Sequence, residues 1–443
     1  SMNIYALSSG RGPSGIAIIR ISGKDTLKVC KNLTKLKDIN SNEVNYCKFY
    51  DPKNDSVIDP EALLLSFPGP NSYTGEDLAE FQVHGSNAVI NALLKTLSEQ
   101  ENCRLAEPGE FTKLAFQNGK IDLLKAESIS DLIHSETEMQ REQAVKFVQG
   151  NASNYYNQLR EKIIKSLAFI EAKIDFADDD LPEKVLKEAY LSIKEIHSDI
   201  SKILENHKIG EKIRDGFRVS IIGEVNAGKS SLLNLLSKRE VAIVSDEAGT
   251  TRDVIETYLN IDGYPVILAD TAGIRSATNE IEKKGISLAL DKSKEADLNI
   301  VVIDNSSKDI DEEIKKLINK NSIVLLNKSD ISNKQNHKFD TDVVLASVTN
   351  NKNIDQLINK IKDKLSNKYS TNDSILISRE RHRVKLNDSL KELDKFLKKD
   401  HNKDLELAAE DLRMATRHLG SIVGKVDVEE ILGSIFKDFC IGK

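Results

Sequence analysis

The chain has 443 residues, of which 63 are Lys or Arg and 70 are Asp or Glu, so its formal net charge is −7 at pH 7. This length exceeds what one hydrophobic core usually supports and predicts two or three domains. The acidic balance excludes a protein that holds nucleic acid by its overall charge, so any contact with RNA has to be local or shared with a partner.

The cysteines and the apolar segments bear on the cellular compartment. The four cysteines form no CxxC motif and no close pair, which favours a reducing compartment over a disulfide scaffold or a zinc site. No apolar run approaches the ~18 residues of a membrane span, and the first residues lack the basic and apolar regions of a signal peptide. We therefore expect a cytoplasmic protein without a membrane span.

The chain up to about Gly119 has the pattern of mixed strand and turn. Two short apolar runs, at 16–21 and 62–65, are bounded by glycine or proline and predict buried strands. From about Lys120 to about Lys212, apolar residues recur at helical spacing with few Gly or Pro, so this part is predicted to be helical.

The pattern changes again at Phe217, where a strand runs into a glycine loop and a helix. Alternating strands and helices follow, which is typical of a wound, mainly parallel α/β sheet. The later strands are predicted at 266–269, 299–303, 323–326 and 343–346, with a helix near 354–365, a polar linker at 366–373 and further helices at 380–436. This order favours a helical domain interrupted by an inserted α/β domain, although two separate helical pieces would give the same pattern.

Residues 223–230 read Gly-Glu-Val-Asn-Ala-Gly-Lys-Ser, a GxxxxGKS motif directly after a strand and at the start of a helix. In this motif the glycines let backbone N–H groups face phosphate oxygens, where the helix N-terminus favours anions. Lys229 would reach the β- and γ-phosphates, and the Ser230 hydroxyl would bind Mg²⁺.

Three further segments complete a guanine-nucleotide switch. Residues 270–273, Asp-Thr-Ala-Gly, end an apolar strand, and Thr250-Thr251 precede them where a loop can offer a hydroxyl to Mg²⁺. Residues 327–330, Asn-Lys-Ser-Asp, end another strand, and the Asp330 carboxylate can accept hydrogen bonds from guanine N1 and N2, a donor pair that adenine lacks. An inactive G domain is the alternative, but the residues that phosphate and Mg²⁺ require are present.

One position departs from the pattern of Ras-type enzymes, which orient the attacking water with a Gln directly after the segment that corresponds to residues 270–273 here. Here the residue is Ile274, so another group must orient the water, and Glu280 and Glu282 follow closely. Asn226 in the glycine loop could hold a monovalent cation beside the phosphates. The alternative roles are those of solvent-exposed surface residues for Glu280 and Glu282 and of a capping residue for Asn226.

These residues resemble a known family. The segments 226–234 and 248–253, with Ile274, resemble the bacterial Era-like GTPases, and three other segments, 67–77, 108–112 and the Phe-Cys-Ile-Gly-Lys of 439–443, are similar to the MnmE (TrmE) tRNA uridine-modification GTPases. The resemblance covers essentially the whole chain. It implies an α+β and α/β multidomain fold: an N-terminal folate-binding and dimerisation domain (1–119), a discontinuous all-helical domain (120–214 and 371–443) and an inserted Ras-like P-loop G domain (215–370).

The resemblance also implies a reaction. Members hydrolyse GTP with Mg²⁺ and K⁺ and work as homodimers with an FAD-containing partner, MnmG (GidA), in a heterotetramer or larger complex. Together they add an aminomethyl or carboxymethylaminomethyl group to C5 of the wobble uridine of certain tRNAs, using a 5-formyl- or methylene-tetrahydrofolate and ammonium or glycine. The alternative is an Era-like GTP-dependent RNA or ribosome assembly switch, which would carry a basic RNA-binding module that the sequence does not show. Which surface contacts tRNA stays open, because the Arg-rich segment 379–383 could equally be a solvated helix start.

The resemblance assigns roles to single residues. Glu282 would orient the water beside Lys229 and Thr251, Ser230 and Thr251 would bind Mg²⁺, and the K⁺ ligands would be Asn226, Ser245, Glu247 and Thr250. Folate would contact Arg20, Glu80, Lys120 and Lys443, and Cys440 is either a reactive thiol or a small apolar residue packed in a C-terminal helix. The residues expected at the GTP site are Asn226, Ala227, Gly228, Lys229, Ser230, Ser231, Ser245, Asp246, Glu247, Ala248, Gly249, Thr250, Thr251, Asp270, Thr271, Ala272, Gly273, Asn327, Lys328, Asp330, Ala346, Ser347 and Val348.

Overall fold

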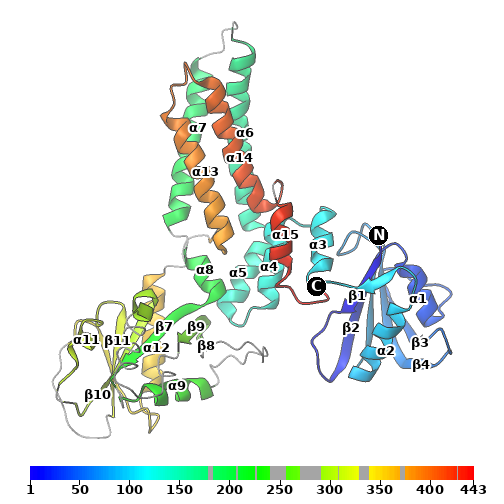
Figure 1. Cartoon of the computed structure of the whole chain (residues 1–443), viewed down its shortest axis with the longest axis horizontal. Helices are drawn as coiled ribbons and strands as arrows, with labels where there is room; N and C mark the ends of the chain where they lie inside the picture. The colour runs from blue at the N-terminus through cyan, green and yellow to red at the C-terminus, as the bar shows by residue number, and fades with distance from the viewer. Residues whose placement is uncertain are drawn as a thin grey trace. The chain divides into compact units, whose positions relative to one another are not determined.

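The structure, a computed structural model, describes residues 1–177, 183–205, 208–224, 227–239, 256–269, 291–307, 309–328, 339–369, 375–426 and 428–443 (Figure 1). The chain divides into two compact units. The first comprises Ser1–Ser130, Phe147–Ile196 and Asp388–Lys443, and the second comprises Asp131–Lys146 and His197–Asn387. Among the described residues, no helix combines the length and the apolar composition that crossing a membrane requires.

The N-terminal part of the first unit is a six-stranded sheet in the order β3-β4-β5-β2-β1-β6. All its pairs are antiparallel except β1 with β6. The strands are β1 (Asn3–Leu7), β2 (Ser14–Ser22), β3 (Val44–Tyr50), β4 (Val57–Phe67), β5 (Leu78–Gly85) and β6 (Cys103–Leu105), and the helices are α1 (Thr26–Thr34), α2 (Asn87–Ser98) and α3 (Glu110–Gln117). The two predicted strands lie inside β2 and β4, but the helices were not predicted.

The two faces of this sheet differ. On one face, alternate strand residues such as Phe49, Leu64 and Phe81 form a buried core with α1 and α2. The other, which we call the second face, is covered over β1 by α3, where Ile4 and Phe111 pack together. Away from β1 it exposes large apolar side chains: Ile16 is 62% exposed, Val44 59% and Tyr46 65%.

The remaining helices confirm the predicted helical pattern. Their bounds are α4 (Leu123–Ile133), α5 (Glu138–Val148), α6 (Asn151–Asp175), α7 (Glu183–Glu205), α8 (Lys208–Asp215), α13 (Glu380–Lys398), α14 (Leu405–Val423) and α15 (Glu429–Phe436). In α14, Ala408, Leu412, Ala415 and Leu419 are fully buried. Their spacing of three to four residues places them along one stripe of the helix, which therefore packs in the interior of the first unit.

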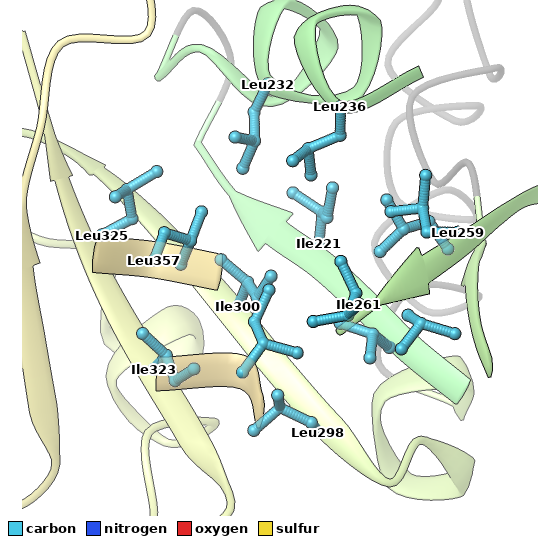
Figure 2. Close-up of a cluster of buried hydrophobic side chains, with 14 of the residues drawn as sticks. Ile221, Leu232, Leu236, Leu259, Ile261, Leu298, Ile300, Ile323, Leu325 and Leu357 are labelled. Atoms are coloured by element: carbon cyan, nitrogen blue, oxygen red, sulfur yellow. The ribbon is translucent and has the colours of Figure 1, made fainter. Parts of the chain in front are cut away.

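The second unit holds a six-stranded sheet in the order β12-β11-β10-β7-β9-β8, parallel except for β8, which pairs antiparallel with β9. Its core gathers leucine and isoleucine from strands and from α9 and α12 (Figure 2). The elements are β7 (Phe217–Gly223), α9 (Lys229–Lys238), β8 (Glu256–Ile261), β9 (Tyr264–Ala269), β10 (Leu298–Asp304), α11 (Glu312–Lys315), β11 (Ser322–Asn327), β12 (Asp342–Leu345) and α12 (Ile354–Lys368). The wound α/β sheet is thus confirmed, and β8 is an addition to it.

The prediction that a polar linker begins at residue 366 was wrong. Helix α12 continues to Lys368 because Leu357, Ile361 and Leu365 keep one stripe of it in the core, and Tyr369 follows with its hydroxyl 2.6 Å from Asp297 Oδ1. Residues 370–374 lie outside the described ranges.

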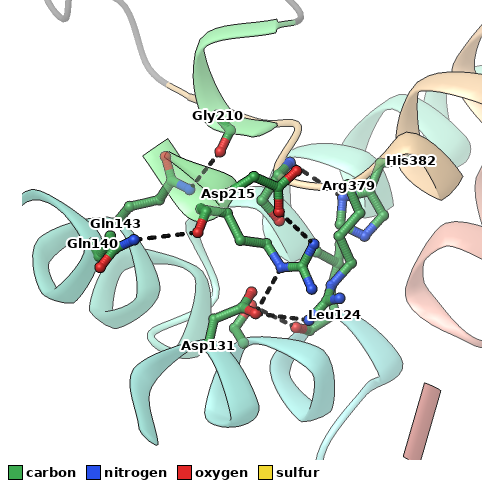
Figure 3. A network of polar contacts seen from close by, with 11 residues as sticks. Leu124, Asp131, Gln140, Gln143, Gly210, Asp215, Arg379 and His382 are labelled. Carbon is green, nitrogen blue, oxygen red and sulfur yellow. Dashed lines mark hydrogen bonds and ion pairs between the residues drawn. The ribbon is translucent and has the colours of Figure 1, made fainter. Parts of the chain in front are cut away.

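The two segments that flank the α/β sheet in the sequence meet at one carboxylate, Asp131 (Figure 3). Arg214 Nε, in α8, donates to Asp131 Oδ1 at 2.9 Å, and Arg379 Nη2 donates to the same oxygen at 2.8 Å. The segments also touch directly, because a Cβ at Gly210 would lie 1.8 Å from the Ile377 carbonyl oxygen.

The same contacts bear on the arginine-rich segment 379–383. Arg383 Nε donates to Glu211 Oε1 at 2.9 Å, and Arg379 is committed to Asp131. These two guanidinium groups are mostly buried and ion-paired. They therefore stabilise the connection to the α/β sheet, which contradicts a solvated helix start for these two residues.

Candidate nucleotide and anion sites

The glycine loop after β7 is built from close backbone packing. Gly228 has a φ of +105°, and a Cβ there would lie 2.1 Å from Asn327 Nδ2. A Cβ at Gly223 would lie 2.4 Å from the Val302 carbonyl oxygen. Only glycine fits these positions, so the motif glycines let the loop lie against the ends of β10 and β11.

Asn327 at the end of β11 joins three loops at the carboxyl edge of the sheet. Its side chain is buried, its Nδ2 donates to the Ala227 carbonyl oxygen at 2.9 Å, and its Oδ1 accepts from Val348 N at 3.0 Å. The next residue, Lys328, pairs with Asp304 Oδ2 at 2.7 Å at the end of β10. Three residues predicted from separate motifs are therefore in direct contact.

Lys229 begins α9, and no acidic side chain among the described residues pairs with it. Burial lowers the pKa of its ammonium, and within the described ranges no side chain forms a hydrogen bond or ion pair with it. Ser230 and Ser231 follow in the first turn of the same helix. A polyphosphate over this turn would supply the missing negative charge and accept the free N–H groups of the helix N-terminus, so the residues present fit GTP and its Mg²⁺.

A second cluster of charges lies on the N-terminal sheet. Arg20 of β2 and Glu80 of β5 are cross-strand partners, with Arg20 Nη2 2.9 Å from Glu80 Oε1. The guanidinium carbon stands 5.2 Å from the Tyr73 ring centroid and 5.5 Å from that of Phe111. Arg20 is only 9% exposed, and its Nε and Nη1 have no hydrogen-bond partner among the described residues. Two buried donors are therefore left for an acceptor from outside the chain.

The last residues of the chain dock beside this cluster. Thr112 donates to the main-chain oxygen of Lys443 through its backbone N at 2.7 Å and its hydroxyl at 2.6 Å, and Ser8 Oγ donates to the Gly442 carbonyl oxygen at 2.8 Å. These bonds bring Lys443 Nζ to 4.4 Å from the Tyr73 ring centroid. Burial, and then the Arg20 guanidinium, lower the pKa of Lys443, whereas Glu80 acts in the opposite direction. The cluster thus holds two cations and one carboxylate around an aromatic ring.

Sequence comparisons decide the family. A model described as "GTP-binding protein TrmE N-terminus" matches residues 3–120, and one described as "MnmE helical domain" matches residues 123–440. The tRNA modification GTPase MnmE of Pelagibacter ubique (strain HTCC1062) is 59% identical over 100% of both chains, and that of Rickettsia bellii (strain RML369-C) is 43% identical over 99% of each. The chain belongs to the MnmE family of tRNA modification GTPases.

Membership in the MnmE family confirms several expectations. The chain is a GTPase of tRNA modification with the multidomain fold of that family, and it uses GTP and Mg²⁺. The solved structure of Era with MgGDPNP and nucleotides 1506–1542 of 16S ribosomal RNA is 28% identical over 40% of this chain and 66% of that one; its TM-score of 0.28 adds nothing to the assignment.

Many of the nucleotide-site residues predicted from the MnmE resemblance lie outside the described residues, as does Ile274. Of the predicted Mg²⁺ ligands, only Ser230 is described, and of the three catalytic residues only Lys229. The predicted site residues outside the described ranges are Asn226, Ser245, Asp246, Glu247, Ala248, Gly249, Thr250, Thr251, Asp270, Thr271, Ala272, Gly273, Glu282 and Asp330.

The structure brings together three of the four residues that the MnmE resemblance assigns to folate. The fourth, Lys120, is exposed, and its Nζ donates to the Pro70 carbonyl oxygen at 2.8 Å, so its hydrogen bond is to the loop that carries Tyr73. Tyr73 and Thr112 were not assigned from the sequence. Both lie within segments 67–77 and 108–112, which carry the resemblance to the MnmE family, and this was the one feature of the sequence that could have pointed to them.

Cys440 is not in a packed helix, so that reading was wrong. Helix α15 ends at Phe436, and Phe436 and Phe439 turn inward with ring centroids 5.2 Å apart, which leaves Cys440 exposed. The Cys440 carbonyl oxygen accepts from Gly109 N at 3.4 Å. Its thiol is therefore accessible, and a reactive role stays a prediction.

Proposed function

We propose that this MnmE-family GTPase, with an FAD-containing partner of the MnmG type, adds a (carboxymethyl)aminomethyl group to C5 of the wobble uridine of certain tRNAs. A tetrahydrofolate derivative bound to the N-terminal domain would supply the one-carbon unit. The observation that carries the folate part of this proposal is the pair of buried, unpartnered Arg20 donors beside Glu80 and Lys443.

The residues of this cluster match the chemistry of a folate. A buried N–H group without a partner costs about 1–3 kcal/mol, and acceptor groups of a ligand would satisfy the free Arg20 donors on either side of the guanidinium. Glu80 is a hydrogen-bond acceptor for the amide and amino groups of a pterin edge, and the Tyr73 ring offers a flat apolar surface. Lys443 adds a second cation, and Lys120 would contact the ligand at the rim of the cluster.

We place the G domain at residues 215–370, as an insertion between the helical segments 120–214 and 371–443. GTP would be hydrolysed in this domain. Asp131 supports this arrangement, because it ties Arg214 before the proposed insertion to Arg379 after it. Ser230 and Thr251 would bind Mg²⁺, and Glu282 would orient the attacking water. The K⁺ ligands would be Asn226, Ser245, Glu247 and Thr250.

The second face of the N-terminal sheet supports a homodimer. Ile16, Val44 and Tyr46 are large apolar side chains that are more than half exposed on this face. Large apolar side chains exposed on one face are typical of contact sites. We infer that a second copy of residues 1–119 covers it, that the dimer joins the flavoprotein in a heterotetramer or larger complex, and that the assembly works in the cytoplasm.

Reconstitution tests the proposal. Purified protein, the flavoprotein partner, methylene-tetrahydrofolate, GTP, glycine or ammonium and unmodified tRNA should yield a modified wobble nucleoside by mass spectrometry. The rate of GTP hydrolysis should be higher in KCl than in NaCl at equal ionic strength, and equal rates would remove Asn226 from its role. Unmodified tRNA together with no measurable folate binding would favour the alternative, an Era-like assembly switch, which needs no folate.

A further inference from the structure

A histidine–aspartate pair on the N-terminal sheet lies outside the sites described so far. Asp59 of β4 is fully buried and accepts hydrogen bonds from His84 N at 2.8 Å and Glu61 N at 3.1 Å. The His84 ring of β5 adds a further contact, with Nδ1 3.0 Å from each Asp59 oxygen. The side chain of His84 is nevertheless 58% exposed.

This geometry fixes the histidine tautomer. Burial alone would raise the pKa of Asp59, but the hydrogen bonds from the two backbone N–H groups and the His84 ring outweigh it and hold the pKa below its ordinary value. The resulting carboxylate accepts a proton-bearing Nδ1, so the neutral ring carries its free lone pair on Nε2. A buried carboxylate that orients an imidazole in this way is the arrangement that enzymes use to prepare a base.

His84 shares the second face with the Arg20–Glu80 cluster. Side chains two residues apart on a strand point to the same face, so Glu80, Gln82 and His84 form one row. At ~3.3 Å per residue, His84 lies about 13 Å along the strand from Glu80. Leu63 and Ile18, the partners of Gln82, occupy the interval. An extended ligand anchored at Arg20 and Glu80 can therefore run along this row toward His84, between this face and the second copy proposed to cover it.

The charges around the imidazole are few. On β4, Glu61 lies opposite His84, two residues along the strand from Leu63, the partner of Gln82. On β2, the facing stretch 14–17 carries no charged residue, and on β3, one strand further, Lys48 is exposed. Asp59 is thus the one ionised group within the described residues that bonds to the ring.

We propose that His84, oriented by Asp59, is the general base that deprotonates the nitrogen donor, an ammonium ion or the α-ammonium group of glycine. This inference rests on the proposed function of the same domain. An N–H bond of the ammonium group breaks and its proton passes to Nε2. The freed lone pair forms a C–N bond to a methylene-level one-carbon unit, whose bond to the carrier nitrogen breaks with its electron pair. The imidazolium then returns the proton to that nitrogen, so no oxidant or reductant is needed.

The decisive variant is His84→Asn in the full chain, because an asparagine amide N–H can replace Nδ1–H at Asp59 while Nε2 is lost. We expect the single-turnover rate of tRNA modification at neutral pH to fall about 10²–10⁴-fold. Folate affinity and GTP hydrolysis should stay within about twofold of the wild type. The rate of the variant should rise about tenfold per pH unit, following the fraction of free amine, whereas the wild-type rate levels off. Glu61→Gln is the matched control: Glu61 is a titratable neighbour that bonds to Asp59 through its backbone N–H alone, which the substitution keeps, so this variant should keep the wild-type pH profile.

The possible outcomes separate the two proposals. A His84→Asn protein with wild-type rate and pH profile overturns the base assignment, and so does one that loses folate affinity, because His84 would then be a binding residue. If the wild-type protein itself binds no folate, the proposed function fails first. A melting temperature equal to that of the wild type shows that the variant is folded, and His84→Gln provides a second test if His84→Asn is not.

Discussion

Replacing Thr112 by valine should release the segment 440–443 from the N-terminal domain. The Thr112 hydroxyl donates to the main-chain oxygen of Lys443 at 2.6 Å and, with its proton used there, accepts from the Tyr73 hydroxyl at 2.8 Å. Valine keeps the shape of the side chain and the backbone N–H bond to Lys443 but removes both hydroxyl contacts. The side chain is fully buried, so water cannot replace them without opening the structure.

Of the two hydroxyl contacts, only the bond to the Lys443 main-chain oxygen joins the segment to the domain, because Tyr73 and Thr112 both belong to the domain. A typical hydrogen bond contributes about 0.5–1.5 kcal/mol net, so the variant should lose about this much docking free energy. Because ~1.4 kcal/mol corresponds to a tenfold change in an equilibrium constant, the undocked fraction should rise about 2- to 12-fold.

Hydrogen exchange measures this opening directly. The backbone amide of Lys443 donates to the Cys440 carbonyl oxygen at 3.3 Å, so its exchange reports on the docked segment. In Thr112→Val, the peptide that contains residues 440–443 should exchange faster by this factor, while the peptide of β2 keeps its rate. Thr112→Ser retains the hydroxyl and is the matched control. Equal exchange in the valine and wild-type proteins would show that the hydroxyl does not hold the segment.

Two further predictions concern the nucleotide loops and the acid stability of the N-terminal sheet. Asn327→Ala removes the two buried hydrogen bonds to Ala227 and Val348. The groups left unpaired cost about 1–3 kcal/mol, so GTP affinity, measured by fluorescence titration, should fall about 5- to 150-fold. An unchanged Kd would contradict the bridging role of Asn327. Asp59 has a lowered pKa when folded, so its contribution to stability is present above about pH 3.9, the ordinary aspartate value, and is lost as the pH falls below it. Thermal melts between pH 2.5 and 7 should show a smaller acid loss for Asp59→Ala than for the wild type, and parallel curves would contradict the linkage.

The α/β sheet could be predicted from the sequence because its strands are buried on both faces. Each central strand is a short apolar run that ends at a polar motif, as β11 ends at Asn327. Such a strand can be recognised without knowing which strands it pairs with. Strand β8 was missed because its mixed pattern, with an exposed Tyr258, reflects an antiparallel position at the sheet edge. The residues of the glycine loop followed from the motif, but the contact of Asn327 with Ala227 required the fold.

The N-terminal site was less accessible to sequence reasoning. Arg20 and Glu80 are 60 residues apart and meet only through the register of β2 and β5. Thr112 binds Lys443 across 331 residues, and no local pattern encodes such a contact. The role of Asp131 was hidden for the same reason, because its two arginine partners lie 83 and 248 residues further along the chain.

The docked segment has a consequence for biosynthesis. Arg20, Glu80 and Thr112 leave the ribosome long before Lys443, and translation of the intervening 331 residues at 5–20 residues per second takes roughly 17–66 s. Throughout that interval the N-terminal sheet can fold, but its charge cluster lacks one of its two cations. A chain that stops before Lys443 therefore keeps the Arg20–Glu80 pair but lacks the second cation of the cluster.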